Sequence, residues 1–184
     1  MAPTKKHWDA LDYVMGYLLK TKNNRLILQP GRVFLNLWSN ASWGGDLERS
    51  RLGFMLKPSN ALILWASKQQ GVVALSTCTA KYVALLESTQ HLVQAINQLT
   101  QLAGNSEKEI FCDNQAAVQV SINNQLRKQM RYLDCTFFFG NGTIRKHGIK
   151  VMLVPMGKMQ ADSLTKWLSG PALQRDLPFR WVGG

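Results

Sequence analysis

The chain has 184 residues, of which 46% are hydrophobic and 18% are charged. This length is sufficient for one domain with a buried core, and the composition excludes a disordered chain. Lys and Arg outnumber Asp and Glu by 22 to 11, and the resulting formal net charge of +11 favours a polyanionic partner over a plain solubilising surface. Nucleic acid is therefore the first partner to consider.

The cysteines and the apolar runs of the sequence indicate the cellular compartment of the protein. Cys78, Cys112 and Cys135 lie far apart and form no Cys-x-x-Cys pair, which is typical of buried thiols rather than of a disulfide framework or a zinc site. Polar residues interrupt the N-terminal apolar run, and no stretch is long enough to span a membrane. We therefore expect an intracellular protein of cytoplasm or nucleus without a membrane partner, although export without a leader stays open.

The first half of the chain predicts one helix and three strands. Apolar residues at three- and four-residue steps predict a helix that begins near Thr4 and includes Leu18. A basic connector with Pro30-Gly31 follows. Short apolar runs separated by turn residues then predict an antiparallel meander over residues 33–39, 51–57 and 61–67.

The second half alternates helices and strands. A long helix is predicted from about Thr77 to Ala103, with Gly104 as its stop. The next elements are a strand over 109–113, a helix over 114–122, a basic helical segment over 127–139, a strand within 148–156 and a short helix over 157–168. This order predicts an α/β fold with a five-stranded mixed sheet, three antiparallel strands followed by two further strands, flanked by helices.

Four positions at the ends of these elements would meet above such a sheet. They are Asn40 at the end of the first strand, Lys81 early in the long helix, Asp113 at the end of the fourth strand, and Asp162 at the start of the last helix. Four acids in these places would form a two-metal phosphodiesterase centre, because Mg²⁺ requires hard oxygen ligands. Only two of the four positions are acidic here.

Several motifs resemble one known family. The segments "LWSNASWGGD", "SKQQGVVALSTCTAKYVAL", "IFCDNQAAVQV" and "MQADSLTKWL" are similar in order and spacing to the RNase H region that closes the polyprotein of Copia-type LTR retrotransposons. The resemblance covers about residues 3–170. It implies an RNase H-like fold and, in active relatives, Mg²⁺-dependent cleavage of the RNA strand of RNA–DNA hybrids.

The resemblance also implies the domain organisation. Residues 1–30 would be a helix and connector left from the tether between polymerase and RNase H. Residues 31–170 would form the RNase H-like domain, and 171–184 a C-terminal tail.

The family's four catalytic acids fall on Asn40, Lys81, Asp113 and Asp162, so two acids are substituted. The family has Ser-Asp-Ala-Asp-Trp where this chain has residues 39–43, and Glu where this chain has Lys81. The formal charge of the four positions changes from −4 to −1. We expect the Lys81 ammonium to replace the metal as counter-ion of Asp113 and Asp162. These would then be vestigial metal ligands of an inactive nuclease that needs no cofactor.

Each of the four residues also has a purely structural interpretation. Lys81 could be a solvated helix residue, and Asn40 could hydrogen-bond the turn that follows it. Asp113 could cap the next helix, and Asp162 could be an acid in the first turn that the helix dipole favours.

Nucleic-acid binding could persist after catalysis is lost, because relatives bind hybrids through phosphates and 2′-OH groups rather than through the catalytic acids alone. The basic residues expected to contact a hybrid or duplex backbone are Arg127, Lys128, Arg131, Arg145, Lys146 and Lys150. Two alternatives remain open. The chain could be an active hybrid ribonuclease with an altered metal site, or a host-adopted interaction module or effector that uses the fold as a scaffold. The sequence identifies no protein partner.

Overall fold

The computed structural model describes residues 2–23, 34–45, 48–59, 61–103, 106–123, 134–168 and 171. The chain divides into two compact units, one that contains the N-terminal helix and one that contains the sheet. The domain boundaries expected near residues 30 and 170 lie outside the described residues. Within the described part of the chain, no helix is both long and apolar enough to cross a membrane.

Helix α1 (Lys5–Thr21) begins where the sequence predicted, directly after Thr4. The backbone N–H of Thr4 donates to Nδ1 of His7 at 2.9 Å, which satisfies one donor at the helix start. No residue of α1 is buried, and Trp8 is 58% exposed. The helical spacing of its apolar residues therefore predicted the element correctly.

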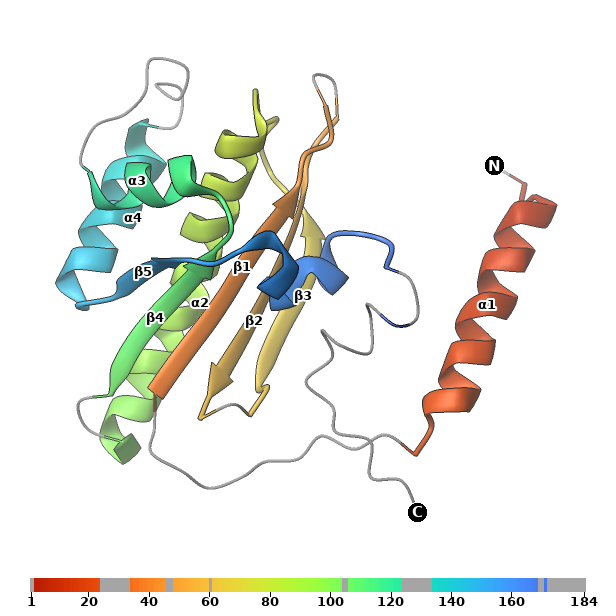
Figure 1. The fold of residues 1–184 in the computed structure, drawn as a ribbon, viewed down its shortest axis with the longest axis horizontal. Coiled ribbons are helices and arrows are strands. Elements are labelled where there is room, and N and C mark those ends of the chain that lie inside the picture. The colour runs from red at the N-terminus through yellow and green to blue at the C-terminus, as the bar shows by residue number, and fades with distance from the viewer. Residues whose placement is uncertain are drawn as a thin grey trace. The chain divides into compact units, whose positions relative to one another are not determined.

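The second unit is built on a five-stranded mixed sheet in the order β3-β2-β1-β4-β5 (Figure 1). Strand β1 (Phe34–Ser42) pairs antiparallel with β2 (Arg51–Pro58), and β2 pairs antiparallel with β3 (Leu64–Gln69). On its other edge β1 pairs parallel with β4 (Glu107–Cys112), which pairs parallel with β5 (Lys150–Leu153). The predicted mixed sheet of three antiparallel and two further strands is confirmed.

Side chains alternate between the two faces of this sheet. Leu35, Leu37 and Ala41 of β1 are buried in the hydrophobic core, so Asn40 projects from the opposite face. Helix α2 (Thr77–Ala103) packs over the core face, where its residues join the same hydrophobic cluster. The two faces therefore have different roles: α2 covers the core face, and Asn40 lies on the other face.

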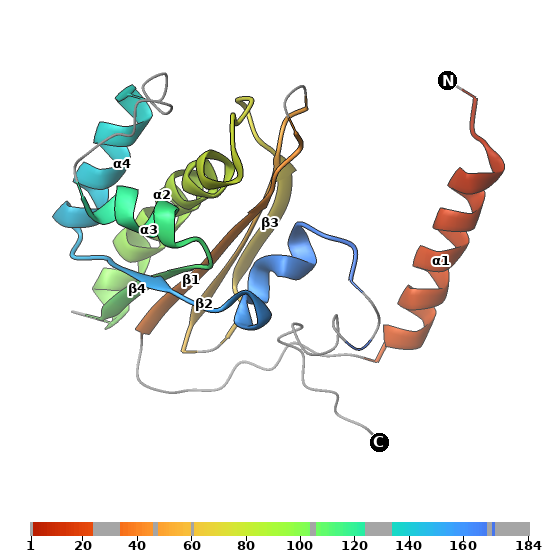
Figure 2. The same ribbon diagram turned by 45° about the horizontal axis from the view of Figure 1, so that its top comes forward.

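Short helices complete the unit. Helices α3 (Gln115–Ile122) and α4 (Asp134–Lys146) pack against α2. The 3₁₀-helix η2 (Met156–Lys158) leads to η3 (Gln160–Leu164), which contacts β1 and β2. Figures 1 and 2 show η3 on the face of the sheet opposite α2.

Several element boundaries differ from the sequence prediction; helix α4, for example, continues to Lys146, beyond the predicted end at residue 139. Strand β1 continues through Asn40 to Ser42, because the ladder to β2 extends as far as the pair Ser42–Arg51. Strand β3 begins at Leu64 rather than at Ala61, because the N–H of Ala61 closes a turn onto the carbonyl of Pro58 at 2.8 Å. The last predicted helix forms two 3₁₀ segments instead of an α-helix.

Candidate functional site

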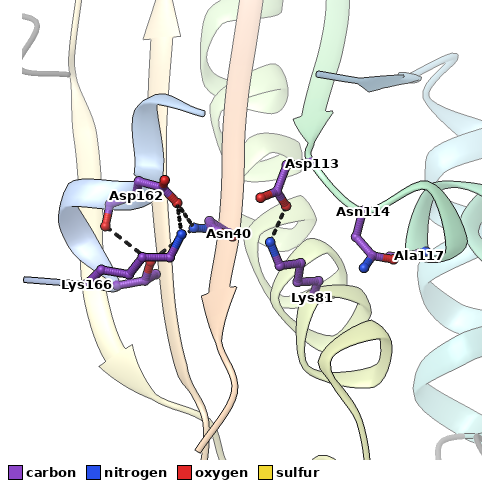
Figure 3. A network of polar contacts seen from close by, with 8 residues as sticks. Asn40, Lys81, Asp113, Asn114, Ala117, Asp162 and Lys166 are labelled. Atoms are coloured by element: carbon purple, nitrogen blue, oxygen red, sulfur yellow. Dashed lines mark hydrogen bonds and ion pairs between the residues drawn. The ribbon is translucent and has the colours of Figure 1, made fainter. Parts of the chain in front are cut away.

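Asn40 and Asp162 come from opposite ends of the chain and meet on the open face of the sheet (Figure 3). The Asn40 amide nitrogen donates to Oδ1 of Asp162 at 2.5 Å and to Oγ1 of Thr165 at 3.0 Å. Asn40 has no exposed surface. The substituted residue therefore directs N–H groups, rather than lone pairs, at the remaining acid.

Lys81 and Asp113 form a second contact of the same kind. The ammonium of Lys81, in the second turn of α2, binds Oδ1 of Asp113 directly after β4. The Lys81 side chain is 9% exposed and that of Asp113 is fully buried. Burial also raises the pKa of the adjacent Cys112 thiol to about 11, as expected in a dry environment. The pair is thus an ion pair shielded from solvent.

The expectation that Lys81 would neutralise both carboxylates is met only for Asp113. Asp162 has a different cation, because Nζ of Lys166 lies 2.9 Å from its Oδ1. Lys166 follows Asp162 by four residues, and its backbone N–H also donates to the Asp162 carbonyl at 3.0 Å. Each remaining acid therefore has its own lysine (Figure 3).

The four family positions thus form two pairs, Asn40 with Asp162 and Lys81 with Asp113. Each pair joins a substituted residue to a remaining acid. Two buried oxygens, Oδ1 of Asn40 and Oδ2 of Asp113, have no hydrogen-bond partner within the described residues. No group of three His, Cys, Asp or Glu side chains gathers among those residues in a way that could hold a metal ion.

Segment η3, which carries Asp162, is anchored to the sheet at both of its ends. The Lys57 ammonium of β2 donates to the side chain of Gln160, and Oγ of Ser67 donates to the carbonyl of Leu164 at 2.6 Å. Burial lowers the pKa of Lys57 to about 8. Between these anchors, a Cβ at Gly53 would lie 2.6 Å from Cβ of Leu164. Only glycine permits this close approach.

Most of the purely structural interpretations are wrong. Lys81 is not solvated, since its residue is 7% exposed. Asn40 binds η3 rather than its own turn. The cap of α3 is Asn114, whose Oδ1 accepts the N–H of Ala117 at 2.9 Å, and not Asp113. Asp162 does lie in the first turn of its helix, as that interpretation expected, although the helix is a five-residue 3₁₀ segment with a small dipole.

Of the six basic residues predicted to contact nucleic acid, the three described ones lie on two elements, α4 and β5. Arg127, Lys128 and Arg131 lie outside the described residues. Arg145 and Lys146 end α4, which packs on α2. Lys150 begins β5 opposite Glu109, on the same sheet face as Asn40.

Sequence reasoning missed three residues on or beside the segment that carries Asp162. Thr165 accepts a hydrogen bond from Asn40, Lys166 pairs with the acid, and Arg51 lies two residues from Gly53 on the same face of the sheet. The spacing of Asp162 and Lys166, four residues apart, was the available signal, since it favours an ion pair. The position of Arg51 had no comparable signal, because it depends on strand register.

Relatives of known sequence include transposon polyproteins. No family model matches the chain. The retrovirus-related Pol polyprotein of transposon TNT 1-94 from Nicotiana tabacum is 29% identical over 168 residues, 89% of this chain and 13% of the polyprotein. That of transposon RE2 from Arabidopsis thaliana is 29% identical over 177 residues, 94% of this chain and 12% of the polyprotein. The chain thus spans about an eighth of the length of these curated relatives.

A relative of a different kind matches a shorter part of this chain. The secreted RxLR effector protein 161 of Plasmopara viticola is 39% identical over 94 residues, which make up 50% of this chain and 66% of the effector.

Solved structures with this fold are RNase H domains. The N-terminal RNase H domain of a Mycobacterium tuberculosis protein superposes with a TM-score of 0.57 at 14% identity, covering 79% of this chain and 99% of that one. An RNase H1 from a compost metagenome, solved with an RNA/DNA hybrid, superposes with a TM-score of 0.55 at 14% identity, covering 71% and 92%. The homologues of this chain are therefore Copia-type retrovirus-related Pol polyproteins, and its fold is that of the RNase H domains.

Proposed function

We propose that this chain is a retrotransposon-derived RNase H-like protein that binds an RNA–DNA hybrid or another nucleic-acid duplex and no longer cleaves it. One observation carries the loss of cleavage. Both remaining acids, Asp113 and Asp162, accept N–H groups from the residues that stand in the two substituted positions.

The donor set does not fit the Mg²⁺ ions of active relatives. Those ions require several carboxylate oxygens, whereas the four positions here carry a formal charge of −1. The contacts described above leave three oxygens that could face a cation: Oδ1 of Asn40, which belongs to a neutral amide, and Oδ2 of Asp113 and of Asp162. Each of the two carboxylates is already paired with a lysine ammonium, which repels a second cation. These residues therefore do not fit a metal-assisted cleavage step.

Nucleic-acid binding is supported by charge and by fold. The net charge of +11 favours a polyanion, because each phosphate contact releases a condensed counter-ion. A structural neighbour of the same fold was solved with an RNA/DNA hybrid. An RNase H fold that lost its metal ligands could retain this surface.

The test compares metal binding and cleavage in the wild type and in the double variant Asn40→Asp, Lys81→Glu. Calorimetry should detect Mg²⁺ binding in the double variant alone, since only that variant has four carboxylates. Cleavage of a labelled hybrid in Mg²⁺ or Mn²⁺ should follow the same pattern. The single variant Asn40→Asp is the matched control, and it should bind no Mg²⁺ because Lys81 remains.

Two outcomes would overturn the proposal. One is cleavage by the wild-type protein, which would indicate an active nuclease with an altered site. The other is equal Mg²⁺ affinity in the wild type and the double variant. A rise in the thermal unfolding midpoint of the double variant on adding Mg²⁺ reports metal binding even where cleavage is not recovered.

The match to a secreted effector favours a second candidate, a protein-interaction module that uses the fold only as a scaffold. Under this alternative the wild-type protein would neither cleave nor bind hybrid or duplex nucleic acid at low salt. Fluorescence anisotropy with labelled hybrid and duplex RNA separates the two candidates.

A further inference from the structure

The negative charge of Asp162 is offset by a lysine, whereas the acids of a metal-dependent nuclease are offset by the metal ions. We infer that the surface around Asp162 binds nucleic-acid phosphates directly, through Lys166 and Arg51, without a divalent cation. The inference rests on the proposed function, because it names the site and the mode of nucleic-acid binding. In a carboxylate-lined site a metal must bridge acid and phosphate, whereas here ammonium and guanidinium groups can contact the phosphate themselves.

Lys166 combines a fixed position with access to solvent. Its Nζ lies 2.9 Å from Oδ1 of Asp162, and its side chain is 40% exposed. The same oxygen of Asp162 also accepts the amide of Asn40 at 2.5 Å. Asp162 would therefore keep a hydrogen-bond donor if the ammonium turned toward a phosphate. An ammonium has three donors, so it can also contact both groups at once.

Arg51 lies beside η3 on the same face of the sheet as Asn40. The register places it opposite Ser42, two residues from the Asn40–Gly53 pair. Its Nη1 donates to Oγ of Ser67 at 3.3 Å, and that hydroxyl donates to the carbonyl of Leu164, two residues before Lys166. A guanidinium has five N–H donors in a fixed fork that suits phosphate, and Ser67 takes one of them.

The charges of the cluster favour an anion. Lys81 offsets Asp113 and Lys166 offsets Asp162, so the four family positions together with Lys166 sum to zero. Arg51, which is exposed, adds one positive charge. The indole of Trp167, next to Lys166, is 92% exposed, and an exposed aromatic beside a cation is typical of surfaces that hold nucleic-acid bases.

The experiment measures the affinity of the wild-type protein for a fluorescent RNA–DNA hybrid, in EDTA and in Mg²⁺ at matched ionic strength. We expect the two dissociation constants to agree within about twofold, apart from direct Mg²⁺ competition for phosphates. The variants Lys166→Gln and Arg51→Gln should each weaken binding several-fold. Each should also reduce the slope of log K against log salt by about 0.9, the value for one lost phosphate contact on a duplex.

Lys68→Gln is the matched control. Lys68 lies on β3 next to Ser67 but faces α2, where it pairs with Glu87 at 3.1 Å. Its removal lowers the net charge by the same amount, so affinity and salt slope should stay at the wild-type values. Thermal unfolding of all three variants checks that the fold is retained.

The outcomes separate this inference from the proposed function. Hybrid binding that disappears in EDTA would overturn the direct-phosphate mode while leaving nucleic-acid binding intact. Salt slopes at the wild-type value in both Lys166→Gln and Arg51→Gln would overturn the assignment of phosphate contacts to these two residues. No binding in either buffer would overturn the proposed function itself, and the inference with it.

Discussion

The Lys81 side chain has lost nearly all of its contact with water, and its partner carboxylate has lost all of it. Removing both charges from solvent costs several kcal/mol each, and only their mutual attraction offsets this cost. In the family a metal ion would neutralise such a carboxylate. Here one residue of the chain itself does so, which makes the charge balance of the site a permanent part of the folded protein.

The first prediction concerns this ion pair. Lys81→Ala should lower the free energy of unfolding by about 3–5 kcal/mol, because it leaves the buried Asp113 carboxylate without a counter-charge. Urea denaturation at neutral pH measures the change. The double variant Lys81→Ala, Asp113→Ala should recover much of the loss, since no unpaired charge remains.

Lys166→Ala is the control for Lys81→Ala. Its pair with Asp162 is half-exposed, so we expect a loss of no more than about 1 kcal/mol. Equal losses in Lys81→Ala and Lys166→Ala would contradict the view that the buried pair has replaced a metal as a structural element.

At the scale of elements, the position of η3 on the sheet sets the position of Asp162. The backbone of η3 has i→i+3 bonds, such as Thr165 N–H to Asp162 carbonyl at 3.0 Å. The Leu164 carbonyl accepts a hydrogen bond from Oγ of Ser67, a residue of the sheet. If an α-helix continued here, a backbone N–H of its next turn would use this carbonyl as acceptor. The contact with Ser67 lies at the last residue of η3, where the helical segment ends.

The second prediction tests this packing. In Gly53→Ala the new Cβ would lie 2.6 Å from Cβ of Leu164 and 2.8 Å from Cγ2 of Thr165, so η3 must move. We expect a loss of stability of about 1–3 kcal/mol, the usual cost of overpacking. NMR should also show a changed side-chain amide signal of Asn40, because its partners lie on η3.

Gly157→Ala provides the comparison within the same region. A Cβ at that position meets nothing within 4 Å, so stability and the Asn40 signal should stay near the wild-type values. An unchanged Asn40 amide in Gly53→Ala would show that η3 does not depend on this close approach.

At the scale of the whole molecule, the net charge of +11 acts on folding and binding in opposite directions. Like charges repel across the compact state, and salt screens them with a Debye length of about 10 Å at 0.1 M. The same salt competes with phosphate contacts. Ionic strength therefore separates the two effects.

The third prediction follows from this difference. Raising NaCl from about 0.02 to 0.2 M should raise the thermal unfolding midpoint, because screening weakens the repulsion among excess cations. Hybrid affinity should fall over the same range, with a log–log slope of about −0.9 for each phosphate contact. A midpoint that falls with salt would mean that specific ion pairs, rather than the net charge, dominate the electrostatics of folding.

The sequence by itself determined the kinds and order of the elements, because apolar periodicity follows local geometry along one segment. It predicted α1 after Thr4, the full length of α2, and the mixed sheet. The resemblance also predicts that Asn40, Lys81, Asp113 and Asp162 occupy the family's four acid positions, and this assignment stays a prediction; Asn40 and Lys81 are not acids.

Only the tertiary structure decided which of these side chains meet. Asn40 and Asp162 are 122 residues apart, and Lys81 and Asp113 are 32 apart, so no local pattern states which acid receives which donor. Strand register placed Arg51 beside η3, and a missing side chain at Gly53 let η3 approach the sheet. These contacts depend on distances across the fold, and such distances are set by packing of whole elements rather than by the residues of any one of them.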